Sequence, residues 1–278
     1  MPPQQIGPTL RAIRKRLQMV AGETARYEAE RILTHVLRVD RSRLYIDSSS
    51  ILDDDQSEQV NRLVEKRLTG QPLAYVLGVA YFHSSEFFVS PSVLIPRPET
   101  ELLVETILEK ESDSECVFLD MGTGTGAIAS VLVRTRHRWR AVAVDSSSEA
   151  ISVARRNCPA AVGLVRMDRL EAISGGSAFD FVASNPPYIS AEEMEHLEAN
   201  VAEFEPHSAL YGGLDGMDFY RYLARYASRH LKEGGRLYCE IGASQAESVG
   251  AILHGEGWKE VHVSSDLAGR DRIVRAHT

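Results

Sequence analysis

Apolar residues in the first 80 positions recur at the spacing of amphipathic helices. Two runs fall between Thr9 and Val39, and a third follows the acidic cluster "DDD" at 53–55 and ends near Gly70 and Pro72. The apolar positions are Leu10, Ile13, Leu17, Val20, Ala29, Ile32, Leu33, Val36, Leu37, Val60, Leu63, Val64 and Leu68. This pattern predicts a small helical bundle over residues 1–78.

The pattern changes after residue 78. The stretch "YFHSSEFFVS" at 81–90 holds two short aromatic runs around a Ser-Ser turn, which predicts a hairpin within a linker of residues 79–97. From residue 98 to 278, apolar strands alternate with amphipathic helices, as in a parallel sheet covered on both faces. Strands are expected at 116–120, 141–145, 162–166, 179–184 and 235–242, and helices at 99–110, 126–135, 148–157, 217–231 and 245–254. The closely spaced final runs at 259–265 and 271–277 predict an antiparallel end to the sheet.

Composition narrows the class of protein. The chain has 278 residues and a formal charge of −8; residues 1–80 hold 12 Lys/Arg against 10 Asp/Glu, and the remainder holds 19 against 29. The net negative charge disfavours binding of nucleic acid over the whole surface. The uneven distribution indicates two surfaces with different partners, although helices that are simply coated with mixed charge would give the same split. The N-terminus lacks a signal-peptide core, and no apolar stretch approaches the ~20 residues that span a bilayer, so we expect a cytoplasmic protein without a membrane partner. Three cysteines without paired or metal-like spacing suit reduced thiols.

A glycine-rich turn, "FLDMGTGTGAIA", joins an expected strand to an expected helix. Glycines at 122, 124 and 126 permit tight turning and close approach of a ligand to the backbone. The pattern also satisfies the dinucleotide motif, so an NAD-type site and a purely structural turn are both alternatives. Asp145 ends the next strand, where a carboxylate accepts both ribose hydroxyls, although an acid there also serves as a helix cap. Asp168 follows the third strand and is placed to accept the exocyclic amine of an adenine, with a solvated loop residue as the alternative.

The stretch "SNPPYIS" at 184–190 ends another strand at the same expected edge. Two prolines make a rigid corner because proline fixes its own backbone angle and restricts its predecessor. In this corner the Asn185 side-chain oxygen and the Pro186 carbonyl form a pair of acceptors that suits an –NH₂ group. An NAD enzyme has no need of such a pair.

Together these residues resemble a known family. "GTGTG", "VD" at 144–145 and "SNPPY" are similar to class I S-adenosylmethionine-dependent methyltransferases that act on planar nitrogen. "LIPRPETE" at 94–101, "FEPHSALYGGLDGMDFY" at 204–220 and "TGQPLAYVLG" at 69–78 bring the chain closer to the release-factor glutamine methyltransferases. "NPPY" alone is shared with DNA adenine methyltransferases, whereas the combination is specific and spans nearly the whole chain.

The resemblance implies an α/β, Rossmann-like class I methyltransferase with a mostly parallel sheet, an antiparallel C-terminal strand and an N-terminal bundle that docks substrate. It implies transfer of a methyl group from S-adenosylmethionine, leaving S-adenosylhomocysteine, to the glutamine amide of the GGQ motif in class 1 peptide chain release factors. Its cofactor-binding residues would be Gly122, Thr123, Gly124, Thr125, Gly126, Asp145, Asp168, Arg169 and Asn185. The catalytic and substrate-binding residues would be Asn185, Pro186, Pro187 and Tyr188, with Leu94 and Arg97 lining the glutamine pocket.

One departure concerns Arg169, which stands where some relatives carry an aromatic residue beside the adenine; its guanidinium plane could still stack on the ring. No metal and no stable nucleic-acid partner are expected. A DNA adenine methyltransferase remains the alternative enzyme, and a cofactor-sensing domain without turnover the alternative from another class.

Overall fold

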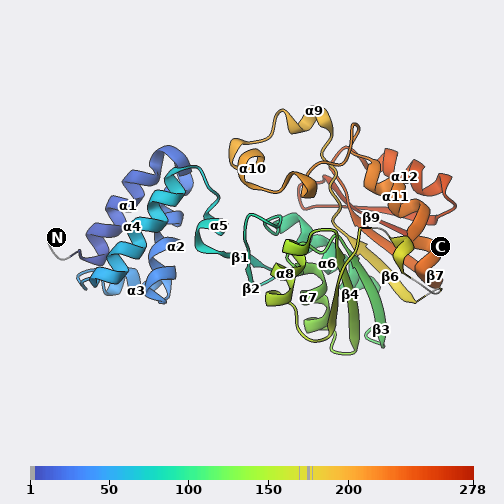
Figure 1. Cartoon of the computed structure of the whole chain (residues 1–278), viewed down its shortest axis with the longest axis horizontal. Helices are drawn as coiled ribbons and strands as arrows, with labels where there is room; N and C mark the ends of the chain where they lie inside the picture. Colours follow the sequence, from blue (N-terminus) through green and yellow to red (C-terminus); the bar gives the residue numbers. More distant parts are fainter. Residues whose placement is uncertain (1–3, 169, 174–175, 177) are drawn as a thin grey trace. The chain divides into compact units, whose positions relative to one another are not determined.

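The computed structural model describes residues 4–168, 170–173, 176 and 178–278 (Figure 1). These form two compact units, which are described separately. One holds the chain up to Gly78 together with Ala199–Phe204, and the other holds Val79–Glu198 and Glu205–Thr278.

The first unit is a bundle of short helices. They are α1 (Ile6–Ala21), α2 (Ala25–Leu37), α3 (Arg41–Ile46), α4 (Asp54–Leu68), α5 (Leu73–Leu77) and α10 (Ala199–Phe204). Asp53 begins α4 with a capping box, accepting from the Gln56 amide while the Gln56 side chain accepts from the Asp53 amide. The three predicted helical runs are confirmed as α1, α2 and α4. The short helices α3 and α5 are not evident in the periodicity because five or six residues hold too little of a 3.6-residue pattern.

The second unit begins with a hairpin of β1 (Val79–Phe82) and β2 (Ser85–Phe88). His83 and Ser84, both at positive φ, form its turn, so the expected Ser-Ser turn lies one residue earlier than predicted. Two successive residues at positive φ are typical of the tight hairpin turns that match strand twist.

The remaining strands form one seven-stranded sheet in the order β5-β4-β3-β6-β7-β9-β8. Their bounds are β3 (Cys116–Met121), β4 (Trp139–Asp145), β5 (Val162–Arg166), β6 (Phe179–Ser184), β7 (Leu231–Glu240), β8 (Lys259–Ser265) and β9 (Asp271–His277). Strands β3 to β7 pair in parallel, and β9 pairs antiparallel with both β7 and β8. The predicted parallel sheet with an antiparallel C-terminal strand is confirmed.

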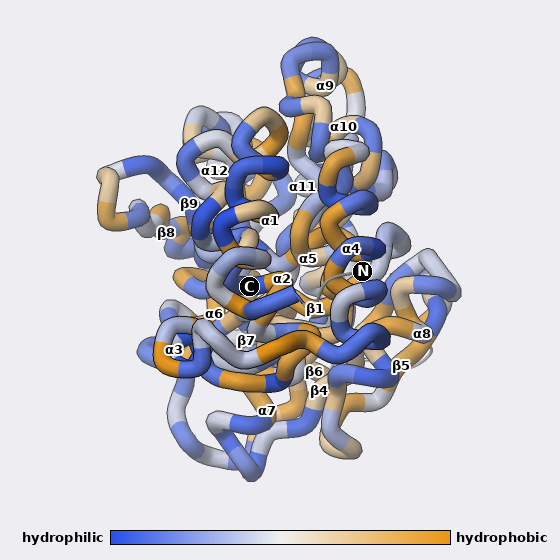
Figure 2. Tube along the Cα trace, turned by 90° about the vertical axis from the view of Figure 1, so that its left-hand side faces the viewer, coloured by the Kyte–Doolittle hydropathy of each residue, from blue (hydrophilic) through white to orange (hydrophobic). Residues whose placement is uncertain are grey.

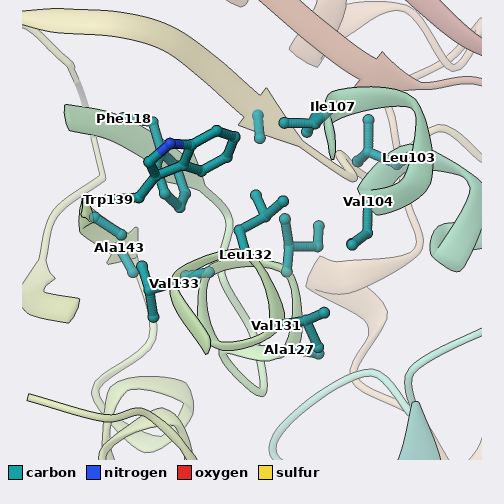
Figure 3. Close-up of a cluster of buried hydrophobic side chains, with 14 of the residues drawn as sticks. Leu103, Val104, Ile107, Phe118, Ala127, Val131, Leu132, Val133, Trp139 and Ala143 are labelled. Atoms are coloured by element: carbon teal, nitrogen blue, oxygen red, sulfur yellow. The ribbon is translucent and has the colours of Figure 1, made fainter. Parts of the chain in front are cut away.

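Helices cover both faces of this sheet (Figure 1). The longer helices of this unit are α6 (Pro98–Lys110), α7 (Ala127–Thr135), α8 (Ser148–Asn157), α11 (Asp218–Tyr226) and α12 (Ala246–Gly255). In the chain, the short helix α9 (Ala191–Met194) and the 3₁₀ turns η3 (His207–Ala209) and η4 (Ala227–His230) come between β6 and β7. Figure 3 shows one core, in which side chains of α6 and α7 point toward Phe118 and Trp139 on β3 and β4. A second core lies under α11 and α12 and contains Trp258. Trp139 and Trp258 are both buried packing residues.

The prediction around residue 231 is partly wrong. Periodicity extended the helix to residue 231 and began the next strand at 235, whereas α11 ends at Tyr226 and β7 already begins at Leu231. Leu231 pairs with Phe179 of β6, and an irregularity in the register precedes the next pair, Phe181 with Arg236. Gly234 and Gly235 therefore lie within the strand because a neighbouring strand supports this segment.

The order of the strands locates a site. The chain runs outward from β3 through β4 to β5, and then returns to pair β6 against the other side of β3. Ligands of open α/β sheets bind beyond the carboxyl ends of the strands at such a reversal. The ends of β3 and β6, which carry the glycine-rich turn and the proline corner, flank this position.

Hydrophobic and hydrophilic residues are interspersed along the helices of both units (Figure 2), as in helices that bury one face. Over the described ranges, none of the helices is both long and apolar enough to span a membrane.

Candidate active site

The turn after β3 is shaped by its own glycines. Gly122, Gly124 and Gly126 all have positive φ, and the Gly126 amide donates to the Thr123 carbonyl at 2.8 Å. A side chain at Gly126 would place its Cβ 2.4 Å from the Cys158 sulfur, so glycine is required there for packing. At Gly122 and Gly124 a Cβ would meet no protein atom within 4 Å, and both residues line the pocket at this edge. The turn therefore presents bare backbone to the pocket.

A buried carboxylate supports this turn from below. Asp120, at the end of β3, accepts from the Thr123 hydroxyl at 2.6 Å and from the Ala129 amide at 3.3 Å. Burial raises the pKa of Asp120 to about 6, with the nearby Asp145 adding to the rise and the two hydrogen bonds opposing it. Its Oδ1 atom is buried without a hydrogen-bond partner.

Asp145 ends β4 beside the same turn. One carboxylate oxygen accepts from the Gly124 amide and the other from the Ser147 amide, both at 2.9 Å. The side chain that caps α8 is Ser147, which accepts from the Ala150 amide. Asp145 is thus not the N-cap, and it ties the glycine turn to the β4 edge while facing the pocket. Each of its oxygens has a further lone pair for a ligand hydroxyl.

Asp168 is exposed and lines the pocket near Met167. The other residue expected beside the adenine, Arg169, lies outside the described residues.

The proline corner after β6 is anchored at its asparagine. Ser184, buried at the end of β6, donates to the Met121 carbonyl and joins the corner to β3. The Asn185 side-chain nitrogen donates to the Thr100 hydroxyl at 2.9 Å, and that hydroxyl donates to a carboxylate oxygen of Glu240 at 2.6 Å. Asn185 lines the pocket with its nitrogen already engaged.

A second set of contacts fixes the other end of the corner. The Gln245 side chain donates to the Tyr188 carbonyl at 2.8 Å and accepts from the Gly242 amide at 3.0 Å. The segment "LYGGLDG" approaches closely, because a Cβ at Gly212 would lie 2.7 Å from the Pro187 carbonyl oxygen. Burial raises the pKa of the Tyr188 hydroxyl to about 12, so this tyrosine is neutral at ordinary pH.

The segment before α6 forms another wall of the pocket, to which both Leu94 and Arg97 contribute. Arg97 is held by Glu205, a buried carboxylate whose oxygens accept from the Arg97 guanidinium at 2.5 Å and the Ile95 amide at 3.3 Å. This ion pair links "LIPRPETE" to the segment that begins with Glu205.

Most of the residues expected from sequence meet around this one pocket. Those that line it are Leu94, Arg97, Gly122, Thr123, Gly124, Thr125, Asp145, Asp168, Asn185 and Pro187. Gly126, Pro186 and Tyr188 belong to the turn and the corner but are not part of that lining. Thr100, Glu205, Gln245 and Glu240 were missed. Thr100 and Glu205 stood inside quoted motifs, but no periodicity or spacing marks them as partners of distant residues.

The pocket suits a nucleoside cofactor better than a metal. Bare backbone at Gly122 and Gly124, a carboxylate at Asp145 and a second acid at Asp168 provide close approach and hydrogen-bond acceptors for hydroxyl and amino groups. Within the described part of the chain, no cluster of three or more His, Cys, Asp or Glu side chains is arranged to hold a metal ion.

A seven-stranded sheet of this order, with a glycine turn and an acid at successive strand ends, defines a class I methyltransferase. The methyltransferase small domain matches residues 98–203, and the PrmC N-terminal domain matches residues 9–78. A solved methyltransferase from Pyrococcus furiosus shares the fold, with a TM-score of 0.53 and 18% identity over 80% of this chain and 98% of that one.

Comparison with curated relatives gives the particular family. The release factor glutamine methyltransferases of Koribacter versatilis and Geobacter sulfurreducens are each 38% identical to this chain, covering 94% and 96% of it and 94% and 97% of their own lengths. That of Pseudomonas aeruginosa is 37% identical over 96% of this chain and 97% of its own. The chain belongs to the release factor glutamine methyltransferase family.

Proposed function

We propose that this protein transfers a methyl group from S-adenosylmethionine to the side-chain amide nitrogen of a glutamine in class 1 peptide chain release factors. The observation that carries the proposal is the anchored Asn185. Its nitrogen is committed to Thr100, so its oxygen is the atom left to accept from a substrate –NH₂ group at the carboxyl edge of the sheet.

Gly122 to Thr125, Asp145 and Asp168 would hold the cofactor. The backbone of the glycine turn accommodates its methionine end, Asp145 accepts from the ribose hydroxyls, and Asp168 accepts from the adenine amine. When bound, S-adenosylmethionine supplies a methyl group that its sulfonium already activates.

The protein must aim a poor nucleophile, because an amide nitrogen shares its lone pair with its carbonyl. The Asn185 oxygen and the Pro186 carbonyl would accept the two substrate N–H groups and turn the nitrogen toward the methyl donor. Holding reactants in this way recovers as much as ~7–11 kcal/mol of a barrier. The same acceptors stabilise the positive charge that the nitrogen gains, and its proton then leaves to water.

The helical bundle would dock the release factor. Arg14 and Lys15 on α1 are exposed and give this unit positive charge, whereas residues 81–278 hold more acidic than basic side chains. Replacing both by glutamate should raise the KM for intact release factor several-fold and leave a short glutamine peptide unaffected. Equal KM values for the intact factor would remove this part of the proposal. Since release factors act on cytosolic ribosomes, we expect the protein in the cytoplasm.

A DNA adenine methyltransferase is the less favoured alternative. It would need a basic groove for flipped DNA, whereas residues 81–278 carry 19 Lys/Arg against 29 Asp/Glu. The deciding experiment incubates the protein with methyl-labelled S-adenosylmethionine and release factor, a release factor whose motif glutamine is replaced by alanine, or adenine-containing DNA. Label on the intact factor alone supports the proposal. Label on DNA, or on none of the three, overturns it.

A further inference from the structure

Asn185 has a supporting chain of two buried groups behind it. Thr100 and Glu240 are 4% and 1% exposed, and they lie on α6 and at the end of β7. The Asn185 nitrogen contacts the Thr100 hydroxyl at 2.9 Å, and that hydroxyl contacts the Glu240 carboxylate at 2.6 Å. Neither Thr100 nor Glu240 is assigned a role by the proposed reaction.

The chemistry of these groups gives the chain a direction. An ionised carboxylate only accepts, so the single hydroxyl hydrogen of Thr100 must point at Glu240. The Thr100 oxygen then faces Asn185 with lone pairs, which only the amide nitrogen can satisfy. The opposite rotamer of the Asn185 amide would set its oxygen against the hydroxyl oxygen. The carboxylate thus decides which end of the amide faces the pocket.

Protonated Glu240 would lose this control. A carboxyl O–H can donate to the Thr100 oxygen, which frees the Thr100 hydrogen to donate to Asn185. The amide can then turn and present its –NH₂ group to the pocket, where a substrate –NH₂ group loses one of its two acceptors, the Asn185 oxygen.

We propose that Glu240 and Thr100 are positioning residues, which orient the Asn185 amide so that its oxygen accepts from the substrate nitrogen only while Glu240 is ionised. This inference rests on the proposed glutamine methylation. It adds that protonation of the buried Glu240 carboxylate controls the rate of turnover.

The surroundings of Glu240 set the pKa of its carboxyl group. Burial raises the pKa of Glu240 to about 7, and the nearby Glu99 adds to the rise. The Thr100 hydrogen bond, Arg272 of β9 and Arg97 before α6 oppose it. Tyr188 and Tyr220 also face this carboxylate, and burial keeps both neutral because it raises the pKa of each hydroxyl. Turnover should therefore fall as pH decreases through about 7.

The test measures kcat and KM on release factor at saturating S-adenosylmethionine from pH 5.5 to 8.5. Saturation matters because burial raises the pKa of Asp120, which supports the cofactor turn, to about 6, within the same range of pH. Glu240→Gln keeps the shape of the side chain and removes its proton equilibrium. Thr100→Val removes the hydroxyl, and Thr100→Ser restores it as the matched control.

We expect Thr100→Val to lower kcat by up to ~10²-fold with little change in KM, the scale of loss when reacting groups are misaligned. Thr100→Ser should recover most of that loss. Glu240→Gln should lower kcat about tenfold at pH 8 and abolish the fall in kcat below pH 7, since a neutral amide no longer enforces one direction. The affinity for S-adenosylmethionine, measured by calorimetry, should be the same in all three variants as in the wild type. An unchanged affinity shows that the pocket is folded.

A flat wild-type profile, an unchanged acid limb in Glu240→Gln, or full kcat in Thr100→Val would each overturn this inference. The proposed function has a separate failure. If the wild-type protein does not label glutamine at any pH, the reaction itself is wrong, whereas active wild type with insensitive variants refutes the positioning chain alone. If Thr100→Val no longer binds cofactor, Thr100→Ser and Glu240→Gln still decide the outcome.

Discussion

The glycine turn after β3 and the proline corner after β6 leave adjacent strands at the same edge of the sheet, yet they are held in different ways. The turn is fixed by its own segment and by the adjacent strand β4. The Gly126 amide donates to the Thr123 carbonyl, the Thr123 hydroxyl donates to Asp120, and Asp145 accepts from the Gly124 amide. The corner is fixed by Thr100 and Gln245, which lie 85 residues from Asn185 and 57 from Tyr188. The backbone of the turn is set by its own glycines and by the next strand along the chain, whereas the orientation of the Asn185 side chain needs partners that are far more distant in sequence.

The glycines that face the pocket and the glycine that packs on the corner have different roles. In the turn, Gly122 and Gly124 have positive φ and expose backbone to the pocket. Beside the corner, Gly212 supplies room: an added Cβ would also lie 2.8 Å from the Tyr188 Cα. The comparison predicts that damage to the turn weakens cofactor binding, and that damage to the corner slows turnover.

The largest expected effect comes from Asn185→Ala, which removes one of two acceptors for the substrate nitrogen. We expect kcat to fall ~10²–10³-fold, as for loss of a preorganised polar contact, with cofactor affinity unchanged. Asn185→Asp keeps an acceptor but loses the donor to Thr100, so it should retain more activity than alanine. Steady-state kinetics on release factor and calorimetry of cofactor binding measure the two effects. Near-normal turnover by the alanine variant would show that the proline corner has a structural role only.

Asp145→Ala tests the turn side of the comparison. It should weaken S-adenosylmethionine binding by ~1.5–3 kcal/mol, the scale of hydrogen bonds to a charged group, and leave kcat at saturating cofactor nearly unchanged. Asp145→Asn keeps one acceptor oxygen, so its affinity for S-adenosylmethionine should lie between those of the wild type and the alanine variant. Calorimetry provides the affinities. If the alanine variant melts earlier but binds the cofactor as tightly as the wild type, Asp145 only orders Gly124 and Ser147.

The smallest expected effect sharpens the role of glycine beside the corner. Gly212→Ala should displace the Pro187 carbonyl and lower kcat about tenfold through misalignment, without weakening cofactor binding. Gly255→Ala, at the end of α12 with no atom within 4 Å of the added Cβ, is the matched control and should behave as the wild type. Equal kinetics of these two variants would show that the corner tolerates displacement.

The sequence alone predicted the fold class, the sheet with its antiparallel end and the placement of the glycine turn. These features depend on short-range signals: strand and helix periods, glycine at positive φ, and proline at a strand end. The same signals identified Asp145, the last residue of an apolar strand, and Asn185, which directly follows another. The roles of the site residues stay predictions until the variants above are measured.

Only the tertiary structure decided what holds the corner. Thr100 and Glu240 come from a helix and a strand far apart in the chain, and a threonine early in an amphipathic helix reads from sequence as an ordinary polar position. The start of β7 at Leu231 was likewise set by pairing with Phe179, against the local helical period. Local signals fix backbone conformations because those depend on neighbouring residues, whereas the direction of the Asn185 amide depends on which groups the folded sheet brings behind it.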